Sequence, residues 1–111
     1  MQCGSFRLLK KSSQCNARLG KLYTTRGIID TPVFMPVGTQ GSVKSVSTEQ
    51  LIESKAQIIL ANSYHIYLRP GLDIIKKAGG IQKFNSWNRP MLTDSGGFQI
   101  FSLNDFRKIK E

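Results

Sequence analysis

QIILAN, residues 57–62, is a compact apolar run that ends in a polar amide. Its length and composition are typical of a strand that is buried inside a sheet. Directly before it, STEQ at residues 47–50 can form a capping box. In such a box the Ser47 hydroxyl accepts from the backbone amide of Gln50, while the Gln50 side chain reaches back to the amide of Ser47. This pattern predicts a helix from about residue 48 to residue 55.

Similar signals for strands and helices flank this unit on both sides. PGLDIIKKAGG, residues 70–80, predicts a second helix, with proline at its start and glycine just past its end. TPVFMPVG, residues 31–38, predicts a first core strand, although its two prolines restrict the ladder bonds that it can make. MLT, residues 91–93, predicts a third strand. The order strand, helix, strand, helix, strand is typical of an α/β fold with parallel strands joined by right-handed crossovers.

The amino-terminal residues have a different pattern. The runs FRLLKK and ARLGKLYTT, within residues 6–25, mix apolar and polar residues and are separated by SSQCN and ended by Arg26-Gly27. Short runs with such breaks predict an antiparallel hairpin or meander. We therefore expect two parts: an antiparallel meander in residues 1–30 and the first βα units of a parallel fold in residues 31–111.

The loops that follow the three predicted strands share one edge of a parallel sheet, where ligands of such folds bind. The loop after the third strand, DSGGF, starts at Asp94 and contains Gly96 and Gly97, whose missing Cβ atoms let backbone amides approach a ligand. The Asp94 carboxylate could bind the N–H edge of a purine-like base or act as a general acid or base, and Phe98 could stack on that base. A tight turn, in which Asp94 and Ser95 only bind backbone amides, fits the same residues equally well.

Charge indicates the class of partner. The chain has 16 Lys and Arg against 7 Asp and Glu, a formal net charge of +9 over 111 residues. Such an excess attracts polyanions and favours nucleic acid as the partner, although a basic surface without a partner is the alternative. Lys44, Arg69 and Arg89 could contact phosphates, but each one taken alone fits an ordinary surface cation better.

The cysteines and the single histidine form no pattern of a known site. Cys3 and Cys15 lack the spacing of a complete zinc or disulfide framework, so no metal ligand is predicted in this chain. His65 is expected to pack rather than to react, because a lone histidine has no partner spacing for metal or nucleophilic work. The opening residues lack a signal-peptide core, and no apolar run reaches the roughly 20 residues of a membrane span. We therefore expect a cytoplasmic location and no membrane partner.

Three segments carry a resemblance to a known family: TPVFMPVGTQGSVK at residues 31–44, ILANSYHIYLRPG at residues 59–71, and DSGGFQIFSL, which starts at Asp94. Together they closely resemble the amino-terminal part of tRNA-guanine transglycosylases, the queuine tRNA-ribosyltransferases. The resemblance extends from about Phe6 to the end of the chain. It implies a (β/α)8 TIM barrel that follows an amino-terminal antiparallel sheet, and three βα units leave such a barrel incomplete in this chain.

The resemblance also implies a reaction. Members of the family exchange guanine at the wobble position of tRNAs with a GUN anticodon for a 7-deazaguanine, through a covalent link between an aspartate and ribose. Asp94 would then be the acid–base aspartate that also binds the edge of the base. The wall of the base pocket would be Ser95, Gly96, Gly97 and Phe98, with Phe98 stacked on the heterocycle.

Other parts of the family pattern are expected beyond this chain. They are the nucleophilic aspartate, a second base-binding aspartate, a base-recognising glutamine, and the ligands of a structural zinc ion. The chain is therefore expected to be an amino-terminal fragment that is inactive alone, in a protein that is a homodimer when full length. The alternative is a non-catalytic accessory subunit or a remnant of the same family, although the intact DSGGF favours the catalytic type. The sequence leaves open which 7-deazaguanine is used.

Overall fold

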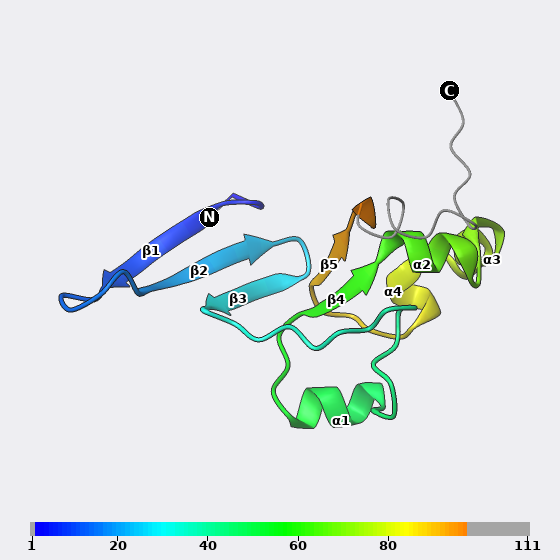
Figure 1. Cartoon of the computed structure of the whole chain (residues 1–111), viewed down its shortest axis with the longest axis horizontal. Coiled ribbons are helices and arrows are strands. Elements are labelled where there is room, and N and C mark those ends of the chain that lie inside the picture. Colours follow the sequence, from blue (N-terminus) through cyan, green and yellow to red (C-terminus); the bar gives the residue numbers. More distant parts are fainter. Residues whose placement is uncertain (1, 98–111) are drawn as a thin grey trace.

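The amino-terminal residues form a three-stranded antiparallel sheet in a computed structural model that describes residues 2–97 of the chain (Figure 1). Its strands are β1 (Phe6–Lys11), β2 (Arg18–Thr24) and β3 (Gly27–Thr31), paired in that order. The Thr24 hydroxyl accepts from Arg26 N–H and donates to the Gly27 carbonyl at 2.7 Å, which closes the turn between β2 and β3. The predicted meander is confirmed.

One face of this meander packs toward the rest of the chain. Leu22 of β2 lies opposite Ile29 of β3, and Ile29 is completely buried. Leu22 and Ile29 border the same hollow as Ile58 and Met91, which lie just before and at the start of the parallel strands. The meander is therefore placed against the amino ends of those strands.

The parallel part of the fold consists of β4 (Ile59–Asn62) and β5 (Met91–Asp94), aligned residue by residue from Ile59↔Met91 to Asn62↔Asp94. Both strands were predicted, and their parallel pairing confirms the α/β interpretation. In Figure 1 this pair lies between the meander and the helices α2, α3 and α4, whose bounds are given below.

Residues 31–38 do not form the regular buried strand that was predicted. Only Val37 makes a parallel bridge, to Leu60, supported by hydrogen bonds from Gly38 N–H to the Leu60 carbonyl and from Leu60 N–H to the Pro36 carbonyl. Phe34 is 82% exposed rather than buried. Because proline has no N–H to donate, Pro32 and Pro36 prevent a continuous ladder, and the segment lies beside β4 without becoming a strand.

The helix before β4 confirms the predicted cap. Helix α1 (Thr48–Glu53) begins after Ser47, whose hydroxyl accepts from Gln50 N–H at 3.1 Å, while Ser47 N–H donates to the Gln50 side chain at 2.9 Å. Leu51 of this helix is buried with Ala56, Ile59 and Trp87 in the main apolar cluster. This cluster fixes α1 against β4.

The helices after β4 agree less well with the prediction. Helix α3 (Leu72–Ala78) ends at Gly79 in the left-handed region, as predicted, but it begins two residues after Pro70. Two helices were not predicted: α2 (Ser63–Leu68) occupies the stretch expected to be a loop, and α4 (Ile81–Phe84) is a single short turn. Among residues 2–97 no helix is long and apolar enough to cross a membrane.

Candidate functional site

The carboxyl ends of β4 and β5 meet at one edge of the sheet. The register places Asn62, the last residue of β4, directly beside Asp94, the last residue of β5. On the other side of β4, Asn62 N–H donates to the Thr39 carbonyl at 3.4 Å. The three segments that the sequence predicted to share an edge therefore do lie together.

Asp94 is half-buried at this edge and already makes one hydrogen bond. Its Oδ1 atom accepts from Gly96 N–H at 3.1 Å, which is the turn geometry that the sequence left open as an alternative. A carboxylate has about four acceptor positions on its two oxygens. The turn thus occupies one oxygen and is compatible with recognition of a ligand by the other.

Gly96 is needed at its position for two physical reasons. Its φ is +68°, in the left-handed region that side chains rarely adopt, and a Cβ built on it would lie only 2.4 Å from the Tyr64 Cβ. The neighbouring Gly97 is unlike it, because a Cβ there would meet only the Ser95 Oγ at an ordinary 3.6 Å. The Asp94 turn therefore lies directly against the first turn of α2.

Helix α2 supports this contact, and sequence reasoning missed it. Asn62 caps the helix by accepting from His65 N–H at 3.2 Å, and Tyr64 is buried in the first turn. Within residues 2–97 the Tyr64 hydroxyl is buried with no hydrogen-bond partner. An asparagine directly after an apolar run was the available signal, because asparagine is a strong N-cap residue.

The remaining predicted site residues fall in three classes. Ser95 and Gly97 are exposed at the edge beside Asp94. Phe98 lies outside the residues that the structure describes. The His65 ring lies edge-on to Tyr64, with ring centroids 5.9 Å apart, which agrees with the packing role predicted for it.

The positively charged residues considered as phosphate ligands are spread over the fold. Arg89 donates to the Ala56 carbonyl at 2.9 Å, and its guanidinium lies 6.0 Å from the centre of the Trp87 ring. These contacts tie Arg89 to the apolar cluster. In contrast, Lys44 and Arg69 are exposed.

The chain matches a known protein family over most of its length. The family model described as queuine tRNA-ribosyltransferase matches residues 13–111 of the chain. The chain belongs to the queuine tRNA-ribosyltransferase family. The resemblance inferred from the three sequence motifs is therefore confirmed, and the match includes β4, β5 and the Asp94 turn.

Curated relatives of the same description are closely similar over this segment. The queuine tRNA-ribosyltransferase of Thermoanaerobacter pseudethanolicus is 65% identical over 106 residues, which are 96% of this chain and 28% of that protein. The relative from Halalkalibacterium halodurans is 57% identical over 111 residues, which are 100% of this chain and 29% of that protein. The chain thus spans less than a third of the length of these queuine tRNA-ribosyltransferases.

Queuine tRNA-ribosyltransferases were expected to hold zinc outside this segment. Within residues 2–97 no group of three or more His, Cys, Asp or Glu side chains comes together. The described residues therefore do not supply a set of donors that fits a structural zinc ion, which takes four ligands.

Cys15 lies exposed at the tip of the hairpin between β1 and β2. A hydrogen bond with the Ser12 side chain, and then one with the Ala17 backbone, hold the pKa of the Cys15 thiol below its ordinary value. Since the thiolate is the reactive form, a lower pKa raises the thiolate fraction near neutral pH.

We expect Ser12→Ala to slow alkylation of Cys15 by iodoacetamide near neutral pH, because the variant raises the Cys15 pKa back toward its ordinary value. The difference should vanish at high pH, where the thiol is fully ionised in both proteins. Mass spectrometry of the Cys15 peptide measures the rate, with Ser13→Ala as the matched control and the Cys3 peptide as the internal standard. Equal rates for Ser12→Ala and Ser13→Ala across the pH range would contradict the assignment.

Proposed function

We propose that this chain is the amino-terminal part of a tRNA-guanine transglycosylase. The observation that carries the proposal is the pairing of Asn62 with Asp94, which brings the DSGGF carboxylate to the carboxyl edge of a parallel sheet in a chain of this family. Ligands of parallel α/β folds bind at that edge. The substrates would be tRNAs with a GUN anticodon, whose wobble guanine is exchanged for a 7-deazaguanine.

The fold that we propose for the complete protein is a (β/α)8 TIM barrel. Residues 1–30 would form the antiparallel meander that precedes it, and residues 31–111 its first βα units. The bridge at Val37 and the strands β4 and β5 would provide the first three positions of the barrel wall. Three positions of eight do not close a barrel. The 111-residue chain is therefore expected to be inactive alone.

Asp94 would have two roles in this reaction. Its Oδ1 stays bound to Gly96 N–H, so Oδ2 is the oxygen that would accept from the N–H edge of the base. A carboxylate at hydrogen-bond distance from the leaving or incoming base can also hold and return the proton that the exchange moves.

The residues after Asp94 would line the base pocket. Ser95, Gly96 and Gly97 would form its wall, because a backbone without large side chains lets a flat base approach closely. Phe98 would stack on the heterocycle. The nucleophilic aspartate that forms the link to ribose would come from a part of the protein that this chain does not span.

Other partners of the complete protein follow from the same resemblance. We propose a cytoplasmic homodimer that carries a structural zinc ion, and its ligands would come from a part of the protein outside the described residues. Such an ion would stabilise the fold around it. It is given no role in the exchange reaction at Asp94.

A chimera tests the proposed function directly. In this chimera residues 1–111 replace the matching segment of the Halalkalibacterium halodurans relative, which is 57% identical and covers the whole chain. We expect the chimera to incorporate labelled guanine into tRNA, and we expect the 111-residue chain alone to incorporate none. A folded chimera that bound tRNA without exchange, while the parent relative was active, would instead support a non-catalytic subunit.

A further inference from the structure

The positive charge of the chain is concentrated in the amino-terminal sheet. Residues 2–29 hold six of the 16 Lys and Arg and none of the seven Asp and Glu. Four of the six lie in β1 and β2 on exposed parts of the strands, namely Arg7, Lys10, Lys11 and Arg18. With Asp30 of β3 included, residues 2–31 have a formal charge of +5, a little more than half of the net charge of +9.

The register places two pairs of like charges directly opposite each other. Arg7 lies across from Lys21, and Lys11 lies across from Arg18. Like charges at directly opposite positions destabilise an antiparallel pair. Lys21 is compensated by Asp30 of β3 at 3.0 Å, and this is the one ion pair in the described part of the chain. Within residues 2–97 no acidic residue forms an ion pair with Lys11 or Arg18 to offset their repulsion.

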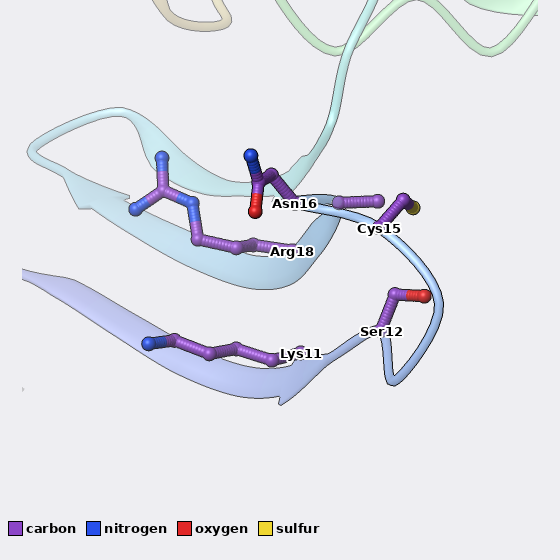
Figure 2. A pocket seen from close by; sticks show the side chains of 6 residues that line it. Lys11, Ser12, Cys15, Asn16 and Arg18 are labelled. Carbon is purple, nitrogen blue, oxygen red and sulfur yellow. The ribbon is translucent and has the colours of Figure 1, made fainter.

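Lys11 and Arg18 are among the residues that line an open hollow near the hairpin tip. Figure 2 shows Lys11 and Arg18 extending in the same direction, away from the tip, whereas the Ser12 side chain points the opposite way. The hollow has a volume of about 360 Å³, and the Asn16 amide adds a donor beside its two cations, whereas the Ser12 hydroxyl is already bound to Cys15. The Arg18 guanidinium lies 6.0 Å from the centre of the Phe6 ring, which limits where it can point. Arginine, lysine and asparagine are among the side chains that bind phosphate oxygens.

We propose that the β1–β2 hairpin binds the phosphate backbone of tRNA, with Lys11 and Arg18 at the centre of the contact. This surface is separate from the Asp94 edge, because the meander packs against the amino ends of β4 and β5. It would read no base and would add affinity through charge alone. The proposal rests on the proposed function, since that function makes tRNA the polyanion present.

The test uses the chimera defined above and a double variant, Lys11→Gln with Arg18→Gln. The matched control is Lys76→Gln with Lys77→Gln, which removes the same charge from exposed positions of α3. Affinity for tRNA is measured over a series of salt concentrations. The hairpin variant should reduce the slope of log affinity against log salt by about 2, which corresponds to two phosphate contacts. The control should leave the slope unchanged.

Enzyme kinetics and binding to lipid vesicles complete the test. At saturating tRNA the hairpin variant should keep the parental kcat while its KM for tRNA rises. Equal salt slopes for the hairpin variant and the control would overturn the proposal. A second result would also overturn it: the hairpin variant no longer binds vesicles that contain anionic lipid, while the salt dependence of its tRNA affinity stays the same as that of the parental chimera. If the chimera exchanges no base, the proposed function fails, whereas the binding slopes still decide the hairpin contact.

Discussion

Replacing Asp94 with Asn in the chimera is expected to lower the rate of guanine exchange at least about 10²-fold, the usual contribution of a general acid–base group. Asn keeps an oxygen that can accept from Gly96 N–H, so the turn at the end of β5 should survive. It loses the charge and the ability to hold a proton. The change therefore separates the chemistry of Asp94 from its role in the turn.

The measurement is incorporation of labelled guanine into tRNA, with thermal unfolding recorded for each protein. Asp73→Asn on the exposed side of α3 is the matched control and should exchange at the parental rate. Asp94→Ala removes both roles and should lose exchange and some stability. An Asp94→Asn chimera with the parental rate would show that Asp94 is a turn residue only.

Replacing Gly96 has the second largest expected effect. Gly96→Ala should lower the stability of the chimera by about 1–3 kcal/mol, because an added methyl group overpacks the contact with Tyr64 and the backbone is strained at φ +68°. The displaced turn would also move the Asp94 carboxylate, so we expect the exchange rate to fall. Gly97→Ala, with an ordinary contact to Ser95, should change stability by less than about 0.5 kcal/mol.

A third variant at the same position separates backbone strain from crowding. Asparagine adopts the left-handed region more readily than alanine, but it also carries a Cβ. If crowding against Tyr64 dominates, Gly96→Asn should be as destabilising as Gly96→Ala. Near-parental stability of Gly96→Asn, measured by thermal unfolding, would show that φ alone requires glycine here.

Local signals account for the parts of the fold that were predicted correctly. The Ser47–Gln50 capping box involves residues three apart, and both of its hydrogen bonds are present at the start of α1. The turn that ends at Gly27 and the left-handed Gly79 after α3 are also local features. Motif resemblance identified the family because three ordered segments carry more information than any one of them alone.

The two errors have different physical origins. Residues 31–38 are apolar enough for a buried strand, but Pro32 and Pro36 lack the backbone N–H groups that a strand needs. Only the pairing with β4 shows how many ladder hydrogen bonds remain. Helix α2 was read as a loop because its N-cap, Asn62, is also the last residue of a strand. One residue that serves two elements cannot be assigned from periodicity.

The sequence by itself determined the antiparallel meander, the helices α1 and α3, the strands β4 and β5, the net positive charge, and the family. Each of these depends on residues that are neighbours along the chain or on composition. Only the tertiary structure decided that Asp94 lies beside Asn62, that Gly96 rests on Tyr64, and that Lys11 faces Arg18. These contacts join residues that are far apart in the sequence or that lie opposite each other on paired strands. The register of such a pair is fixed by packing and turn geometry rather than by the identity of any one residue.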